Sequence, residues 1–213
     1  MQKMSAVSST QKELKTISVF VTNLAKYNNG ELIGEWLDLP TTPKKIKQCF
    51  KRIGINNSKH EEFIFTDYKS SIEGISKYIS EYSNLNELNY LAYKLEELDD
   101  DDIKIYEAAI DLNGYVQSLA DLINLTGNLD CFHCLYGLKD EYDLGYYWIV
   151  ESGCYNLELL GKLADYFDYE AFGYDIALEQ GGIFYAGHYI YCMEESFYEN
   201  YDGKNVPEEY CLL

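Results

Sequence analysis

The stretch ISVFVTNLAKYNNGELIGEWLDLP, residues 17–40, predicts two strands that pair around a turn. Residues 17–24 are rich in β-branched and apolar side chains, which favour extended structure, and residues 32–39 supply the returning strand. Between them, the Asn-Asn-Gly sequence at 28–30 has the residue types that tight turns require. The ordered part of the chain is therefore expected to begin with a β-hairpin.

A helix and a third strand are expected directly after this hairpin. Thr42 is a suitable N-cap, Pro43 suits the first helical position, and Gly54 is expected to end the helix. The sequence EEFIFTDY, residues 61–68, has the composition of a strand. We therefore predict a ββαβ module over residues 16–69.

Residues 70–127 change to the period of helices. Apolar side chains recur at helical spacing over 72–79, 85–95, 103–110 and 116–123. This part of the chain therefore predicts a small helical module.

Residues 128–193 mix both patterns and predict an acidic α+β module. CFHCLYG, residues 131–137, favours a short strand, and residues 140–153 favour a helix. Further helical residues are expected to end at Gly173, followed by closing strands at 176–178 and in GIFYAGHYIYCM. The fold class is therefore α+β.

The net charge of −19 is distributed unevenly along the chain. Residues 1–60 carry ten Lys or Arg and four Asp or Glu, a net charge of +6. From Leu95 to the last residue, four lysines stand against 26 acidic residues, a net charge of −22. Six of these acids lie in residues 194–213, which show no clear period and are expected to form an acidic tail.

The acidic part of the chain indicates which partners it repels and attracts. A strongly negative surface repels the phosphates of nucleic acids and membranes and speeds encounters with basic proteins. Solubility alone requires a net charge of only about 2 to 8 in a small domain. We therefore expect a basic protein partner and no direct binding to nucleic acid or membrane.

The sequence also predicts a cytoplasmic protein. It has no run of about 18 apolar residues, which a membrane span requires. Residues 1–15 are expected to be a flexible tail, and they lack the apolar core of a signal peptide. Six irregularly spaced cysteines are expected to stay reduced in that compartment.

Four consecutive aspartates stand out in LEELDDDDIKIYEAAIDL, residues 95–112. A calcium loop that began at Asp99 would need an oxygen ligand at its fifth position and glycine at its sixth, where Ile103 and Lys104 stand. Weak binding of a divalent cation by isolated carboxylate pairs remains an alternative. The favoured interpretation is that Asp99 caps a helix and the next three aspartates fill its first turn, where the helix dipole favours anions.

Other catalytic or metal motifs have little support. CFHC, residues 131–134, could be half of a zinc site or a redox pair, but the sequence has no second C-x-x-C and continues as a strand. No G-x-S-x-G, H-E-x-x-H or G-x-x-x-x-G-K-[ST] motif is present, and chance carboxylate pairs are common among 36 acids. We therefore predict a protein that is not an enzyme and uses no cofactor or metal. A hydrolase with scattered carboxylates is the enzymatic alternative.

Several strings resemble the ArdA family of antirestriction proteins. VFVTNLAKYNNGELIGEWLDLP is similar to the family's opening, EEFIFTDY to its third strand, and SNLNELNYLAYKLEEL to a family helix. YYWIVESG and DYFDYEAFGYDIALEQGGIF resemble its closing region, so the resemblance covers roughly residues 17–193. The chain departs from the pattern in its N-terminal tail, in its acidic extension after Met193, and at Tyr174, where many relatives carry arginine.

The resemblance implies an elongated chain of three small modules that forms a homodimer and mimics bent DNA. Such a protein occupies the DNA-binding channel in the methyltransferase core of type I restriction–modification enzymes without catalysing a reaction. An acidic module that binds another basic protein is the alternative function.

The resemblance also suggests which residues meet the partners. It places the aspartate run near the dimer contact, so Leu91, Leu95 and Leu98 are candidate dimer contacts, with the core of the helical module as their alternative role. The enzyme is expected to be contacted by an array of acidic side chains. These are Glu96, Glu97, Asp99, Asp100, Asp101, Asp102, Glu107, Asp111, Asp121, Asp130, Asp140, Glu141, Asp143, Glu151, Glu158, Asp165, Asp168, Glu170, Asp175 and Glu179.

Overall fold

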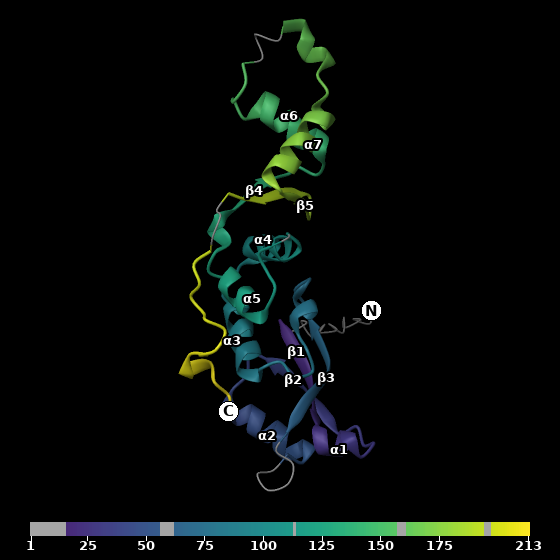
Figure 1. Ribbon diagram of the computed structural model, residues 1–213, viewed down its shortest axis with the longest axis vertical. Helices are drawn as coiled ribbons and strands as arrows, with labels where there is room; N and C mark the ends of the chain where they lie inside the picture. The colour runs from purple at the N-terminus through teal and green to yellow at the C-terminus, as the bar shows by residue number, and fades with distance from the viewer. Residues whose placement is uncertain (1–15, 56–61, 113, 157–160, 194–196) are drawn as a thin grey trace, which may run out of the picture.

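The computed structural model describes residues 16–55, 62–112, 114–156, 161–193 and 197–213. It shows an elongated α+β protein with two separate three-stranded sheets (Figure 1). The first sheet lies toward one end of the long axis, a group of helices lies in the middle, and a pair of helices lies toward the other end.

The N-terminal sheet has β1 (Ile17–Asn23) at its centre. It pairs antiparallel with β2 (Gly34–Leu39) on one side and with β3 (Phe63–Ser70) on the other, which confirms the three strands predicted from the sequence. The expected turn is more elaborate than a hairpin, because a short helix, α1 (Leu24–Asn28), follows β1 directly. Asn23 explains this early end of the strand, since its side chain accepts a hydrogen bond from the Lys26 amide at 3.1 Å and so caps α1.

The predicted helix after the hairpin is α2 (Pro43–Ile53). It begins as expected, with the Thr42 hydroxyl accepting a hydrogen bond from the Lys45 amide at 3.4 Å. It ends at Gly54, whose φ of 79° is the left-handed conformation that favours glycine. Its buried face packs under the sheet, and its lysines stay exposed.

The middle of the chain is helical, as predicted. Three α-helices form it, α3 (Leu85–Glu96), α4 (Asp100–Asp111) and α5 (Leu119–Leu125). The first predicted helix is only a 3₁₀ turn, Ile75–Tyr78. The reason is Gly74, whose φ of 82° lies in the left-handed region, so a right-handed α-helix cannot run through it; a Cβ atom at this position would also collide with the Ile110 side chain.

The second sheet contains β4 (Phe132–Tyr136), β5 (Ile183–Tyr185) and β6 (His188–Cys192) in the antiparallel order β4-β6-β5. This confirms the strand predicted at CFHCLYG and the strands expected in GIFYAGHYIYCM. The helix predicted after β4 has two parts, α6 (Glu141–Tyr146) and a π-helical turn at Tyr147–Glu151.

One prediction for this region is wrong. The helix expected to stop at Gly173 is α7 (Tyr169–Gln180), which follows a 3₁₀ segment at Gly161–Tyr166 and ends at Gly181. Residues 176–178 are therefore helical and do not form a strand. Glycine at position 173 does not end the helix. It lets the backbone of α6 pack closely against α7, which is a second role that glycine can have in a helix.

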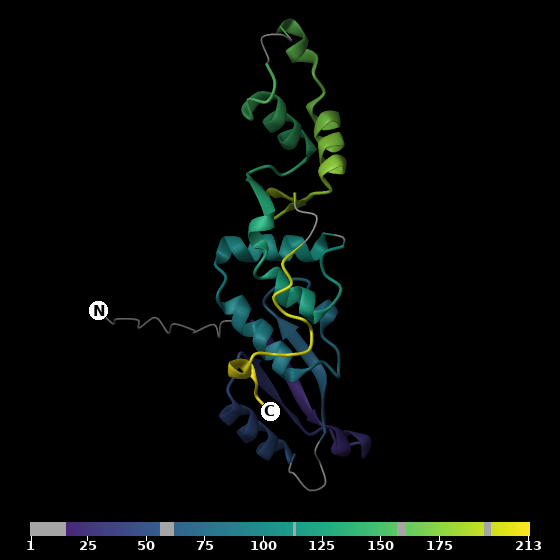
Figure 2. The same cartoon turned by 60° about the vertical axis from the view of Figure 1, so that its left-hand side comes forward.

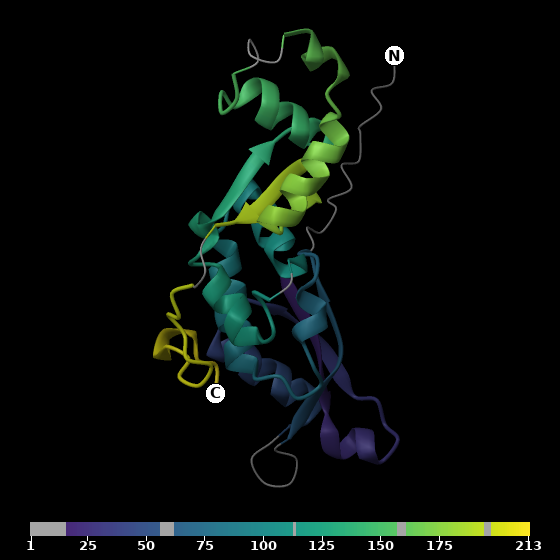
Figure 3. The same ribbon diagram turned by 45° about the horizontal axis from the view of Figure 1, so that its top comes forward.

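Among the described residues, two clusters of buried side chains form the core. The larger cluster is continuous from β1 through the middle helices to Phe132 and Ile190 in the second sheet. The smaller cluster joins the second sheet to the helix pair, which lie side by side in Figure 3, and it contains Tyr189, Tyr191 and Leu144 of α6. The module boundaries inferred from the sequence remain predictions.

Residues 197–213 do not extend away from the body. They run back along α5 and α3 toward the N-terminal module, as Figure 2 shows for the yellow segment. Tyr201 and Leu212 are only 5% and 3% exposed, so this segment belongs partly to the larger cluster.

Buried tyrosines make the stability of this fold sensitive to alkali. Burial raises the pKa of Tyr189 and of Tyr201 to about 12, whereas a tyrosine in an unfolded chain titrates near 10. The unfolded state therefore loses these protons first, so stability is complete below about pH 10 and falls as the pH rises toward 12. We expect the urea midpoint to fall between pH 8 and pH 11, and to fall less in the Tyr189→Phe and Tyr201→Phe variants. Equal declines in wild type and variants would contradict this origin.

Candidate partner-binding surface

The far end of the molecule, residues 137–181, is called the acidic tip here. In the sequence it holds ten acidic residues and two lysines, a net charge of −8. Acidic residues start both of its helices. The Asp140 carboxylate accepts the Asp143 amide at 3.0 Å at the start of α6, and the Asp168 carboxylate accepts the Ala171 amide at 3.0 Å at the start of α7. Helix capping thus explains two of the ten acids and leaves most of them facing solvent.

Two glycines allow α6 and α7 to cross with their backbones in contact. A Cβ atom on Gly145 would collide with the Tyr169 carbonyl group, and a Cβ atom on Gly173 would collide with the Glu141 carbonyl group. Positions 141 and 145 therefore face 173 and 169, so the two helices run antiparallel. The sequence did not predict this contact. Its only signal was a Gly-Tyr pair in each segment, inside the first predicted helix at Gly145 and at the expected end of the second at Gly173.

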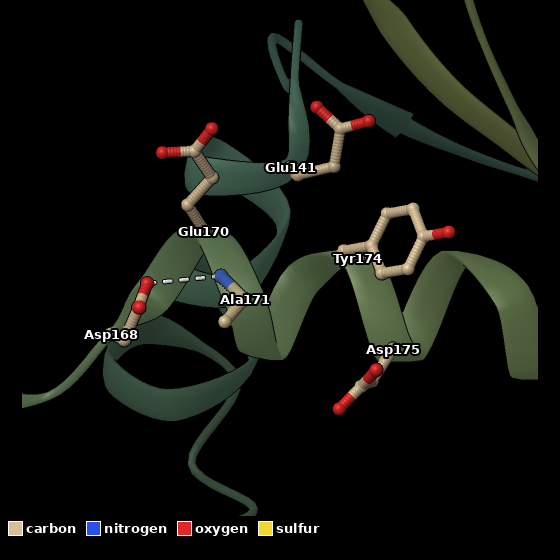
Figure 4. Close-up of a pocket in the computed structure, with 6 residues that line it drawn as sticks. All are labelled: Glu141, Asp168, Glu170, Ala171, Tyr174 and Asp175. Atoms are coloured by element: carbon tan, nitrogen blue, oxygen red, sulfur yellow. Dashed lines mark hydrogen bonds between the residues drawn. The ribbon is translucent and has the colours of Figure 1, made fainter.

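The crossing brings carboxylates of both helices to the rim of one shallow hollow of about 490 Å³ (Figure 4). Its lining comprises Glu141, Asp168, Glu170, Ala171, Tyr174 and Asp175. The carboxylates in Figure 4 point apart and do not converge on one point, and no basic side chain lines the hollow. This arrangement suits contact with several separate cations better than coordination of a single metal ion.

The aspartate run begins α4 as the sequence predicted. The Asp99 carboxylate accepts the amides of Asp101 and Asp102, both at 2.9 Å, and Asp102 accepts the Asp99 amide at 3.4 Å in return. This reciprocal pair is a capping box. The Lys104 ammonium lies 2.7 Å from Asp101 and lowers the pKa of that carboxyl group through its hydrogen bond.

The capping role of Asp99 can be separated from its charge. Asp99→Ala should lower the free energy of unfolding by about 1 kcal/mol, because the helix loses its cap, whereas Asp99→Asn keeps an acceptor and should cost much less. We expect both variants to bind the partner with nearly full affinity. Urea unfolding and a binding assay measure the two effects. Complete loss of binding in Asp99→Asn would show that this one charge is essential.

Other predicted site residues serve the fold or are partly neutralised. Glu107 accepts hydrogen bonds from the Glu73 amide at 2.8 Å and the Tyr185 hydroxyl at 2.9 Å, so it joins α4 to β5. Burial, then the hydrogen bond to Glu107, raises the pKa of Tyr185. Lys77 lies 2.9 Å from Asp111. These contacts reduce the contribution of Glu107 and Asp111 to a free negative surface.

Most of the predicted acids are nevertheless exposed. Asp102, Glu107, Asp121, Glu141 and Asp143 are half-buried, whereas Glu158 and the Asp165 side chain lie outside the described part of the structure. The exposed members are Glu96, Glu97, Asp99, Asp100, Asp101, Asp111, Asp130, Asp140, Glu151, Asp168, Glu170, Asp175 and Glu179. They extend from the end of α3 to the acidic tip and do not gather at one point (Figure 1).

The candidate dimer leucines have a different environment. Leu91 and Leu95 are 0% and 2% exposed in the core of this chain, and Leu98 is half-buried against it. The alternative role noted from the sequence, packing of the helical module, is therefore the one that the structure gives to Leu91 and Leu95.

The described residues contain no group of three or more His, Cys, Asp or Glu side chains placed to hold a metal ion. In the CFHC sequence, His133 stacks on Tyr191 with ring centroids 5.3 Å apart, and burial raises the pKa of the Cys134 thiol. A raised pKa disfavours the thiolate that metal binding and redox chemistry require. Within the described part of the chain, no helix is long and apolar enough to cross a membrane.

Comparison with known protein families gives a match over most of the chain. A family model described as antirestriction protein (ArdA) matches residues 19–191, which is most of the chain. No curated protein matches it.

Proposed function

The chain belongs to the ArdA family of antirestriction proteins, which inhibit type I restriction enzymes, and we propose that it inhibits them as a mimic of DNA. The observation that carries this proposal is the line of exposed carboxylates from the end of α3 to the acidic tip of an elongated molecule. A channel that binds DNA presents lysines and arginines to an extended row of phosphates. A row of fixed carboxylates competes for the same side chains.

The amount of charge fits this role. The net charge of −22 from Leu95 onward equals that of the phosphates in about 11 base pairs of duplex DNA, and a homodimer would match about 22. This is the length of DNA that a sequence-specific enzyme contacts. The mimic also avoids a cost that DNA bears, because its charges are already arranged and no duplex has to be bent.

The molecule is basic at one end and acidic at the other, and this distribution of charge supports one orientation in the channel. The exposed lysines of α2, which are Lys44, Lys45, Lys47 and Lys51, lie at the end opposite the acidic tip. A basic channel attracts the acidic tip and repels α2. We therefore propose that the part from α4 to the acidic tip enters the channel, and that α2 stays outside it.

Catalysis has no part in this mechanism. Inhibition follows from occupancy, so it is stoichiometric and reverses when DNA outcompetes the protein. We further propose that the methyltransferase core of the enzyme, which holds the DNA, is the binding partner and that the inhibitor acts as a homodimer.

Competition for a purified type I methyltransferase tests the proposal. A fluorescent duplex bound to the enzyme should be displaced by this protein at a molar ratio near that of the binding sites, without any metal requirement. Binding should weaken steeply between 50 and 200 mM salt, as counterion release requires. Undisturbed DNA binding at saturating protein would reject DNA mimicry, and it is the outcome expected of an acidic module for some other basic partner.

A further inference from the structure

The segment 197–213, called the strap here, is held both by hydrogen bonds to its main chain and by a few buried side chains. The Asn124 side chain alone makes three hydrogen bonds to it. Its amide donates to the Tyr201 carbonyl at 2.9 Å, and its oxygen accepts the amides of Asn200 and Tyr201 at 2.9 and 2.8 Å. Asn124 lies on α5 and is only 8% exposed. The amide of a buried side chain is thus bonded, through both its nitrogen and its oxygen, to the backbone of a segment that begins 76 residues further along the chain.

Three more asparagines form hydrogen bonds to the main chain of the strap, and one of them, Asn128, both donates and accepts as Asn124 does. The fully buried Asn128 donates to the Tyr198 carbonyl at 3.0 Å and accepts the Tyr198 amide at 2.8 Å. On α3, Asn89 donates to the Tyr210 carbonyl at 2.9 Å, and Asn86 accepts the Leu212 amide at 2.8 Å. Side chain amides that pair with both the N–H and the C=O of an extended chain recognise its backbone whatever its side chains are.

Apolar anchors supply the remaining contacts of the strap. Phe197 stacks on Tyr115 with ring centroids 5.1 Å apart, and Tyr210 stacks on Tyr90 at 4.6 Å. Tyr201 and Leu212 are almost completely buried. The acidic side chains of the strap, which are Glu199, Asp202, Glu208 and Glu209, are all exposed.

We propose that the face of α3 and α5 is a peptide-binding groove, and that the strap is a ligand which it binds within the same chain. The groove takes an extended peptide that carries an aromatic anchor and, eleven residues later, a leucine, as Tyr201 and Leu212 do. Two observations indicate that the strap is distinct from the part of the fold that binds it. The family match ends at residue 191, before the strap begins, and the strap contributes no strand to either sheet. This inference does not depend on DNA mimicry.

The groove cannot stay empty without a cost. If the strap left, the buried amides of Asn89, Asn124 and Asn128 would lose hydrogen-bond partners. A peptide that restores those bonds should therefore bind in place of the strap. Because the native strap is tethered, its effective concentration is high, and a free peptide competes only after the tether is cut.

Cleavage of the folded chain tests the proposal. A specific protease site placed between Met193 and Phe197 allows the strap to be separated without refolding the body. After cleavage, the strap should coelute with the body on gel filtration and should exchange with a fluorescent peptide of residues 197–213, followed by anisotropy. The uncut protein should not bind this peptide. The far-UV circular dichroism spectrum of the body should stay unchanged during exchange.

Matched variants identify how the groove recognises the peptide. Asn124→Ala in the cleaved protein should weaken peptide binding at least about tenfold, since three hydrogen bonds are lost. A peptide with Glu199→Gln, Glu208→Gln and Glu209→Gln should bind as well as the native peptide, whereas one with Tyr201→Ala and Leu212→Ala should not bind. The proposal is overturned if the cut strap never exchanges, if the body unfolds when the strap leaves, or if the peptide with the three glutamates changed to glutamine fails to bind.

Discussion

Replacing Gly145 or Gly173 with alanine is expected to disrupt the acidic tip and to abolish inhibition. In each variant the new methyl group would overlap a backbone carbonyl of the opposite helix, Tyr169 in one case and Glu141 in the other. A change of rotamer cannot relieve this overlap, so the helices must move apart. Alanine gains about 0.5–1 kcal/mol over glycine inside a helix, but overpacking of this kind costs about 1–3 kcal/mol or more. The balance is therefore destabilising.

Hydrogen exchange and circular dichroism distinguish local from global damage. We expect faster exchange in α6 and α7 and little change in the N-terminal sheet, because the smaller core cluster lies between the second sheet and these helices. Leu178→Ala is the matched control, since this side chain is on α7 but is 65% exposed. It should change stability by less than about 0.5 kcal/mol. Full inhibition by Gly145→Ala with a loosened tip would mean that the tip does not enter the enzyme.

The same two glycines show where prediction from sequence reached its limit. Local sequence signals predicted the ends of helices correctly where the residue type has one usual role, that of a helix cap. Examples are Thr42 and Gly54 at the two ends of α2 and Asp99 at the start of α4. A glycine inside a helical pattern has two uses, to stop the helix or to admit another backbone. Only the partner helix decides between them, and for Gly173 the second use was correct.

The candidate surface was predictable in composition but not in detail. Charge counts place the acids in the second half of the chain, yet they cannot show that Asp101 and Asp111 lie beside lysines or that Glu107 joins α4 to β5. These pairings join residues up to 78 positions apart in the sequence. The strap was equally hidden, because backbone recognition by asparagines such as Asn124 leaves no periodic pattern in the segment that is recognised.

Neutralising many exposed acids together should abolish inhibition, although each single change has little effect. Eight acids suit this test because they make no helix cap or ion pair in the described structure, so their replacement by Asn or Gln removes charge with little effect on the fold. Seven of them are exposed, Glu96, Asp100, Asp130, Glu151, Glu170, Asp175 and Glu179, and the eighth, Glu141, is half-buried. A protein with 6–10 ionic contacts to DNA loses about 10³–10⁵ in affinity when salt screens them. The variant with all eight replacements should lose affinity for the methyltransferase on that scale.

The salt dependence of binding decides whether these acids act as a distributed array. Each single replacement should weaken binding by less than about threefold at low salt. The variant with all eight replacements should also show a flatter plot of log affinity against log salt concentration, because fewer counterions are released. Changing Lys44, Lys45, Lys47 and Lys51 to glutamine is the matched control, and it should leave affinity unchanged or raise it. If one neutralisation removed activity by itself, or if the variant with all eight replacements kept the wild-type slope of log affinity against log salt concentration, the partner would be recognising specific residues. The charge from α4 to the acidic tip would then be incidental to inhibition.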